Sequence, residues 1–143
     1  MQKNPARKTV KTPASNFTGD VYLNMVFEGD GTSELTCGLV RFTPGARTNW
    51  HTHANGQLLV CTDGTGLVGS RDGSTVVLRA GESVWIAADE EHFHGGTQET
   101  MMCHYAIVDG AGPKDATTWL DPVTDTDYQA AHKAAGMVNT GKE

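Results

Sequence analysis

Two His-x-His pairs constrain the fold of this chain more than any other feature of its sequence. They are His51-Thr52-His53 and His92-Phe93-His94, and a further histidine, His104, follows the second pair. In a β-strand, alternate side chains project from the same face, so each pair aims two imidazoles in one direction. The pairs therefore predict extended backbone at both places, with imidazoles close enough together to ligate one metal ion.

The rest of the chain has the pattern of an all-β domain. Glycine is frequent, with 17 residues against 5 prolines, and short apolar runs recur between turn signals such as Asp63-Gly64 and Asp72-Gly73. These runs predict strands over residues 21–27, 35–42, 57–62, 67–70, 75–78, 83–87 and 101–108, with 45–53 extended. So many short strands in one domain predict a sandwich or barrel, because a single hairpin cannot bury a core.

Only the end of the chain predicts a helix. It runs from about Thr126 to Ala135, with Asp125 as its N-cap and Gly136 ending it. His132 lies on this helix and is expected to be solvated. The predicted organisation is a flexible N-terminal tail over residues 1–15, one domain over 16–128, and a helix end and tail over 129–143.

Composition excludes several classes of function. The net charge is −6, from 17 acidic and 11 basic residues, whereas a nucleic-acid surface needs clustered Lys and Arg. No apolar stretch approaches the ~18 to 20 residues that cross a bilayer, so no membrane contact is expected. The basic segment before Asp20 is compatible with mitochondrial targeting, but a loose tail and a cytoplasmic protein are favoured. Three widely spaced cysteines, Cys37, Cys61 and Cys103, predict free thiols in a reducing compartment.

The spacing around the histidines resembles the two motifs of the cupin family. Gly45-x5-His51-x-His53-x3-Gln57-x6-Gly64 resembles the first motif, with Gln in place of the usual Glu. The second motif keeps its first Gly and its His, at Gly81 and His92, but Ala87, Asp89 and Gly96 replace its Pro, Gly and Asn. These departures affect turn residues more than ligands. The resemblance implies a double-stranded β-helix, the cupin jelly-roll barrel, followed by the short C-terminal helix.

The same resemblance implies one divalent metal ion inside the barrel, bound by His51, His53, Gln57 and His92. His94 would line the same cavity, and His104 would be either a cavity residue or a hydrogen-bonded core histidine. Manganese is favoured, although imidazole nitrogens and an amide oxygen also accept iron, nickel, cobalt or zinc. Gly38, Val40 and Phe42 share a parity that points them into the cavity, unless the register is shifted by one residue.

Gln57 changes the expected chemistry, because all four ligands are then neutral and the full charge of the ion remains. Such an ion is a stronger Lewis acid, and its oxidation to a trivalent state is disfavoured. The sequence therefore favours polarisation of a bound oxygen over redox turnover, although an anionic substrate would restore the charge balance.

Residues 44–53, Gly56-Gln57 and residues 92–95 resemble the small single-domain bacterial cupins that include the manganese-dependent hydroxynitrile lyases. The resemblance implies a metal-dependent lyase that cleaves a carbon–carbon bond of a small 2-hydroxynitrile, with His94 or His104 as general base. The alternatives are a metal-dependent dioxygenase or oxidoreductase, an isomerase or decarboxylase, and a non-enzymatic cupin that binds a small ligand. The expected partners are a small-molecule substrate and further copies of the chain, in a homodimer or higher homo-oligomer.

Overall fold

Strands dominate the computed structural model, which describes residues 1–110 and 117–137. The elements in chain order are β1 (Val10–Lys11), β2 (Phe17–Thr18), β3 (Val21–Glu28), β4 (Thr36–Phe42), β5 (Arg47–Thr48), β6 (His51–His53), β7 (Gln57–Ser70), β8 (Thr75–Arg79), β9 (Ser83–Ile86), β10 (His92–Gly96), β11 (Met102–Val108), β12 (Thr117–Trp119) and α1 (Asp125–Ala134). The expected all-β fold with one short C-terminal helix is confirmed.

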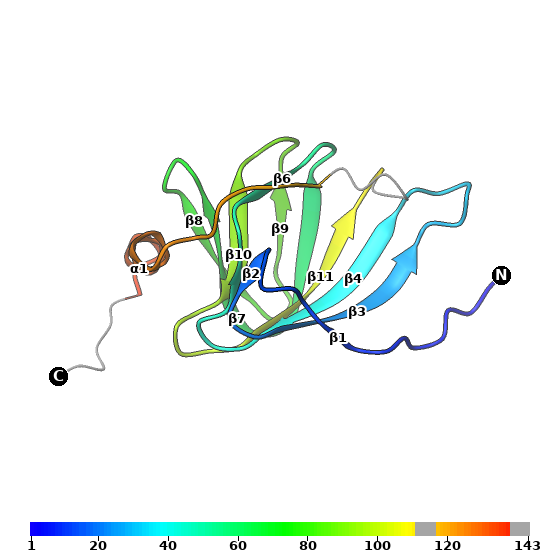
Figure 1. Ribbon diagram of the computed structural model, residues 1–143, viewed down its shortest axis with the longest axis horizontal. Helices are drawn as coiled ribbons and strands as arrows, with labels where there is room; N and C mark the ends of the chain where they lie inside the picture. Colours follow the sequence, from blue (N-terminus) through cyan, green and yellow to red (C-terminus); the bar gives the residue numbers. More distant parts are fainter. Residues whose placement is uncertain (111–116, 138–143) are drawn as a thin grey trace.

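The strands form two antiparallel layers that share one long strand (Figure 1). One layer has the order β1-β3-β4-β11-β7-β9, and the other contains β2, β5, β10, β7 and β8 with β6 and β12 beside them. The strand β7 belongs to both, since its first half pairs with β11 and β9 and its second half with β10 and β8. The two layers curl around a common interior, as expected of a jelly-roll barrel.

The turn predicted at Asp63-Gly64 is wrong, because β7 continues through it. Both residues pair with β11, opposite Cys103 and Met102. Gly64 has φ +77°, and a Cβ atom there would lie 2.1 Å from the carbonyl oxygen of Met101. The glycine therefore bends the strand from one layer into the other without ending it.

The core inside the barrel is formed by alternate residues of the facing strands. Its buried members are Val21, Val40, Phe42, Ala46, Leu59, Cys61, Val68, Leu78, Ile86 and Met102. Gly38, Val40 and Phe42 lie on the buried face of β4, so the parity predicted for them is correct. The three cysteines are free thiols, and Cys61 and Cys103 are buried.

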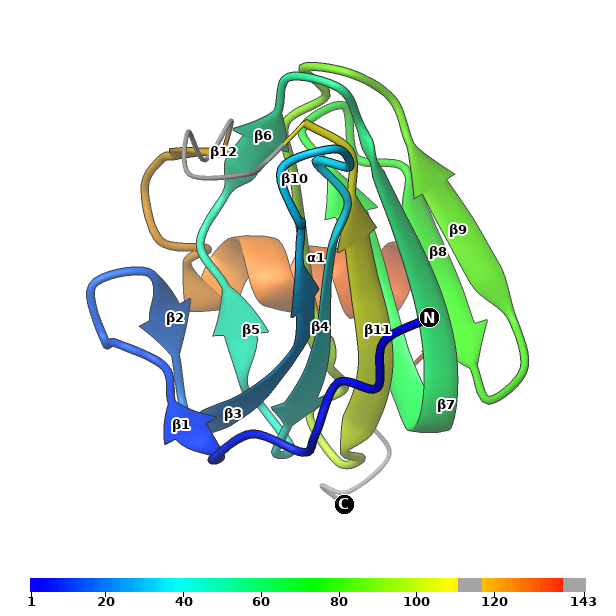
Figure 2. The ribbon, with the colours of Figure 1, turned by 90° about the vertical axis from the view of Figure 1, so that its right-hand side faces the viewer.

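A second apolar cluster lies between the outer face of the barrel and α1, which crosses behind the strands (Figure 2). It contains Trp50, Leu67, Phe93, Val123, Tyr128 and Ala131. Because α1 covers this face, every residue of β10 is buried although its side chains alternate between the two sides. Phe93 packs outward against Trp50, at 5.2 Å between ring centroids, while His92 and His94 point into the barrel. The side chains of His92, Phe93 and His94 therefore alternate across the strand, as the sequence predicted.

A buried arginine on β5 links α1 to the barrel. The Arg47 guanidinium on β5 lies 4.2 Å from the centre of the Tyr128 ring and donates to the Val123 carbonyl oxygen at 2.7 Å. It also pairs with Asp125 at 3.0 Å. The carboxylate of Asp125 therefore holds the first turn of the helix rather than capping it.

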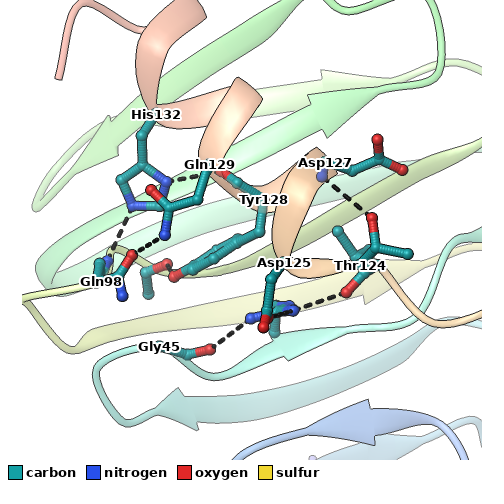
Figure 3. A network of polar contacts seen from close by, with 11 residues as sticks. Gly45, Gln98, Thr124, Asp125, Asp127, Tyr128, Gln129 and His132 are labelled. Carbon is teal, nitrogen blue, oxygen red and sulfur yellow. Dashed lines mark hydrogen bonds and ion pairs between the residues drawn. The ribbon is translucent and has the colours of Figure 1, made fainter. Parts of the chain in front are cut away.

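Two expectations about the helix need correction. Its N-cap is Thr124 rather than Asp125, because Thr124 has extended backbone and its hydroxyl accepts the backbone N–H of Asp127. His132 is buried rather than solvated: its Nδ1 donates to the Tyr128 carbonyl oxygen, and its Nε2 accepts the N–H of Gln98 at 2.9 Å. Both ring nitrogens are used, since the helix docks against the loop that contains Gln98 (Figure 3).

Tyr128→Phe is expected to lower the free energy of unfolding by about 1 to 2 kcal/mol, because the buried Gly96 carbonyl oxygen loses its 2.5 Å partner, the Tyr128 hydroxyl. Burial also raises the pKa of this hydroxyl to about 12, so it remains a donor at any working pH. Urea unfolding monitored by circular dichroism measures the effect, with the exposed Thr126→Ala as control on the same helix. Equal stability of Tyr128→Phe and the parent would contradict the assigned role.

The segment before β2 lies partly along the edge of the first layer. Val10 pairs with Leu23, and Lys11 forms an ion pair with Asp20 at 3.0 Å. Arg7 pairs with Glu28 on the same edge. In residues 1–110 and 117–137, no helix is long and apolar enough to cross a membrane.

Candidate metal centre

The pairing of β6 with β10 brings three histidines together inside the barrel. His51 lies directly opposite His92, and His53 lies two residues along the same face. One ring nitrogen from each lies within 4.8 Å of those of the other two, and all three side chains are buried. Two ligands at about 2.1 Å from one ion are separated by roughly 3 to 4 Å, so small movements of the rings would complete such a site.

Hydrogen bonds on the outer side of the rings select the nitrogen that faces inward. His51 Nδ1 lies 2.9 Å from the Asn49 carbonyl oxygen, and His92 Nδ1 lies 2.8 Å from that of Glu90. A carbonyl oxygen only accepts, so each Nδ1 carries the proton and each Nε2 presents a lone pair. This is the tautomer that a metal ligand needs, and it is fixed by the backbone.

Gln57 opens β7 and reaches the same place. Its Oε1 atom lies 3.2 Å from Nε2 of His92. With the His92 proton on Nδ1, both facing atoms are acceptors, so no hydrogen joins them and a cation between them would remove their repulsion. Ligands at right angles around one ion lie about 3 Å apart, so the residues present fit a divalent metal. The role of Gln57 as the fourth ligand stays a prediction.

The electrostatics keep the site neutral without an ion. Burial lowers the pKa of His92, and burial together with the neighbouring histidines lowers that of His51 well below its ordinary value. Both rings are therefore uncharged near pH 7, with one nitrogen free of a proton and ready for coordination. Among the described residues no Asp or Glu is buried, so no carboxylate within the barrel offsets the charge of a bound ion.

His94 and His104 form a pair beside the three histidines. His94 Nδ1 lies 2.9 Å from His104 Nε2, and the rim of Phe42 packs against both rings. The His94 ring is 5.2 Å from that of His51, between centroids, and His104 reaches the cluster through His94. Within the described part of the chain, His94 Nε2 and His104 Nδ1 are buried without a hydrogen-bond partner. The His104 side chain is thus both hydrogen-bonded and turned towards the interior of the barrel. Both expectations for it, a cavity residue and a hydrogen-bonded core histidine, therefore apply.

His104 makes the stability of the metal-free protein pH-dependent. Burial lowers its pKa from 6.5 to about 4, so below pH 6.5 the unfolded chain takes up a proton that the folded chain does not. The free energy of unfolding should fall by about 3 kcal/mol from this group as the pH drops from 6.5 to 4, and recover above 6.5. Urea unfolding after EDTA treatment, across this range, measures the slope. His104→Gln should show a flatter dependence than the parent, and identical slopes would contradict the assignment.

One cavity of about 590 Å³ lies away from these groups, outside the barrel. It is bounded by Thr65, Arg79, residues 97–100 and the face of α1 that carries His132 and Lys133. None of the clustered histidines of the barrel lines it. The chemistry therefore places the candidate site inside the barrel, where neutral imidazoles and an amide oxygen converge, rather than in this outer groove.

Sequence reasoning missed two residues that contact the cluster. Thr117 and Trp119 lie on β12, next to the histidines of β6, with the Thr117 hydroxyl 2.9 Å from Nδ1 of His53. A Thr-x-Trp alternation is compatible with a strand, but three residues are too few for a periodic signal.

Fold and site together define a jelly-roll barrel with an interior histidine cluster suited to a divalent metal. The family model for the cupin domain matches residues 38–108. The (R)-mandelonitrile lyase of Granulicella tundricola is 38% identical over 119 residues, which cover 83% of this chain and 90% of that protein. The chain belongs to the cupin family, and its predicted resemblance to the hydroxynitrile lyase group is confirmed.

Two solved structures agree with this assignment. A cupin-like protein from Thermotoga maritima is 32% identical and superposes with a TM-score of 0.79, over 87% of this chain and 92% of its own. A cupin-2 domain from Rhodospirillum rubrum is 14% identical, with a TM-score of 0.68 over 96% and 93% of the two chains. The second similarity concerns the fold alone.

Proposed function

We propose that this protein is a metal-dependent hydroxynitrile lyase that cleaves a small 2-hydroxynitrile into an aldehyde and hydrogen cyanide. The observation that carries the proposal is the His94–His104 pair beside the three-histidine cluster, in a chain 38% identical to an (R)-mandelonitrile lyase. The neutral ligand set supports it, because an ion held by His51, His53, Gln57 and His92 keeps its full positive charge. Mn²⁺ is the ion we propose.

Each group of residues has a separate role in the proposed reaction. When bound, the metal ion supplies a Lewis acid for the hydroxyl oxygen of the substrate. His94 is the general base in this proposal: when the proton shared with His104 Nε2 is on His94 Nδ1, the buried Nε2 of His94 keeps a lone pair, in a ring 5.2 Å from that of His51 between centroids. His104 orients this ring and favours the required tautomer. The apolar side chains of Val40 and Phe42, on the buried face of β4, exclude water from the reacting groups.

The reaction balances with one proton in transit. His94 Nε2 takes the hydroxyl proton, and the electron pair of the O–H bond forms the second carbon–oxygen bond of the aldehyde. The pair of the breaking carbon–carbon bond leaves with cyanide. His94 then returns its proton to cyanide, so the products are the aldehyde and hydrogen cyanide and the enzyme is unchanged.

Mandelonitrile tests the proposal directly. Protein reconstituted with Mn²⁺ and protein treated with EDTA are compared by the absorbance of released benzaldehyde, in mildly acidic buffer where spontaneous decomposition is slow. The expected result is a rate that follows metal content and differs between the (R) and (S) enantiomers. A rate equal to background with one metal per chain would refute the lyase. Oxygen uptake with a phenolic or dicarbonyl substrate would instead identify the dioxygenase alternative.

A further inference from the structure

We propose that the outer face of strands β4, β11, β7 and β9 binds a second copy of this chain in a two-fold dimer. The inference is independent of the metal site and of the lyase reaction. Val40, Leu59 and Ile86 of these strands belong to the core inside the barrel, so the residues that alternate with them point outward. These outward residues, named the apolar face, are Cys37 and Leu39 of β4, Tyr105 and Ile107 of β11, Leu58 and Val60 of β7, and Trp85 of β9.

The strand register makes this face continuous. Its side chains form two rows across the strands, one of Leu39, Tyr105 and Val60 and the next of Cys37, Ile107, Leu58 and Trp85. Paired residues on strands about 4.8 Å apart have adjacent side chains, so each row is unbroken. The next outward residue of β4 is Arg41, which donates to Oδ1 of Asn24 at 2.5 Å. The charged side chain therefore lies at the border of the apolar face and not within it.

The two layers of the barrel differ in how their outer faces are covered. The helix α1 packs on the layer that contains β10 and lies behind the strands of the apolar face in Figure 2. Neither apolar cluster of residues 1–110 and 117–137 includes any of the seven residues of the apolar face. Trp85 is 62% exposed, and the other six are half-buried. Contiguous apolar surface of this kind on a soluble protein indicates an interaction site.

Trp85 is held in place although it is exposed. Its indole lies against the backbone of Gly56, where a Cβ atom would come within 2.6 Å of Cζ2 of the ring. Gly56 also has φ +81°, a conformation that favours glycine. An aromatic side chain that is already positioned loses little conformational entropy when a partner covers it, which makes Trp85 suited to anchor an interface.

The size and chemistry of this face fit a second copy. The five neighbouring strands from β3 to β9 span about 24 Å, and the seven residues of β4 extend about 23 Å, so the sheet has a projected area of roughly 550 Å². The accessible surface of protruding side chains exceeds this projection and approaches the about 800 Å² per partner of a stable interface. In a two-fold dimer a face meets its own copy, and uncharged apolar rows place no like charges opposite each other.

The N-terminal segment adds charge complementarity between copies. It follows β3 at the border of the apolar face, where Nδ2 of Asn24 donates to the Arg7 carbonyl oxygen at 3.0 Å, and its first residues extend away from the barrel (Figure 1). Residues 1–19 contain four basic and no acidic residues, which leaves 7 basic and 17 acidic residues, a net charge of −10, for the rest of the chain. Lys3 and Lys8 form no ion pair within the described residues. A second copy on the apolar face brings an acidic surface towards these two side chains.

Matched charge insertions test the inference on the full chain. Trp85→Lys and Leu58→Lys place a cation on the apolar face, at two residues that lie opposite each other on β9 and β7. Val76→Lys makes the same kind of change at a residue of β8 that is 43% exposed and lies outside this face. Sedimentation velocity over about 1 to 100 µM gives the dimer dissociation constant. Circular dichroism and urea unfolding report whether each variant is folded.

We expect the parent to sediment as a dimer, and Trp85→Lys and Leu58→Lys to raise its dissociation constant at least about 30-fold, as loss of an interface hot spot does. Val76→Lys should associate as the parent does. Dilution of the parent should shift tryptophan emission to longer wavelength as Trp85 becomes exposed to water, and Trp85→Phe should lack this shift. A parent that is monomeric over the whole range would overturn the proposal and leave the face to a partner of another kind. A dimer that withstands both insertions, or an equal loss in Val76→Lys, would also overturn it.

The contribution of the N-terminal segment is tested separately. Lys3→Glu combined with Lys8→Glu should weaken the dimer at low salt and reduce the salt dependence of its dissociation constant, because exposed charges are screened by salt. The apolar face is unchanged in this variant, so dimers should persist at higher protein concentration. A dissociation constant equal to the parent's at low salt would exclude these two lysines from the interface.

Discussion

His94→Ala should retain about one metal ion per chain but cleave mandelonitrile about 10²- to 10⁴-fold more slowly, the range expected when a general base is removed. The reason is geometric. His94 lies beside the three-histidine cluster, with its ring 5.2 Å from that of His51, and its Nδ1 is occupied by His104. Its Nε2 is buried and has no hydrogen-bond partner among the described residues.

Two further variants distinguish loss of the metal ion from loss of the general base. His51→Ala should lose metal and activity together, because one ligand is removed. His104→Gln should retain metal and show a smaller loss of kcat with an altered pH profile, since His104 acts through the tautomer of His94. Metal content by elemental analysis and kcat for (R)-mandelonitrile are measured on the same samples. A His94→Ala protein with full metal content and the parent's kcat would exclude His94 as the base, and a loss confined to His104→Gln would transfer that role to His104.

The part of the site that the sequence could predict is the part with local periodicity. Alternation within His51-Thr52-His53 and His92-Phe93-His94 depends only on extended backbone, so the inward direction of both pairs follows from neighbours in the chain. The inward parity of Val40 and Phe42 on β4 was instead taken from the resemblance to the cupin family, and the buried face of the strand agrees with it. Motif spacing added Gln57, which the structure brings to 3.2 Å from His92.

The remaining features depend on contacts between distant segments. Thr117 contacts His53 only because β12 pairs with β6. A strand of three residues is too short for its sequence to indicate which strand it pairs with. His132 is buried because α1 docks against the loop that contains Gln98. A polar side chain on a polar helix predicts exposure, and nothing in the local sequence indicates this contact. Gly64 illustrates a different ambiguity, because a positive φ serves a turn and a bent strand equally well, and only the register with β11 decides between them.

Gln57→Glu tests whether the neutral ligand set favours Lewis-acid chemistry of the bound ion over its oxidation. A carboxylate in place of the amide keeps an oxygen donor at the position 3.2 Å from His92 Nε2 but adds one negative charge to a site in which no described carboxylate is buried. The variant should bind Mn²⁺ at least about 10-fold more tightly, because the added charge attracts the ion within a low-dielectric interior. Cleavage of mandelonitrile should slow by about 10-fold or more, since part of the ion's charge is then neutralised before the substrate binds.

Gln57→Leu is the matched control, because it removes the oxygen donor without adding charge. If the amide oxygen is a ligand, Gln57→Leu should bind Mn²⁺ more weakly than the parent, whereas Gln57→Glu binds it more tightly. The charge argument also predicts that the Mn²⁺ signal in electron paramagnetic resonance disappears at a lower oxidant potential in Gln57→Glu, because a carboxylate stabilises the trivalent ion. A Gln57→Glu protein that cleaves mandelonitrile as fast as the parent would show that the net charge of the site does not set the rate. In that case the neutrality of the ligand set, which distinguishes this chain from the usual cupin motif with Glu at this position, would have no catalytic consequence.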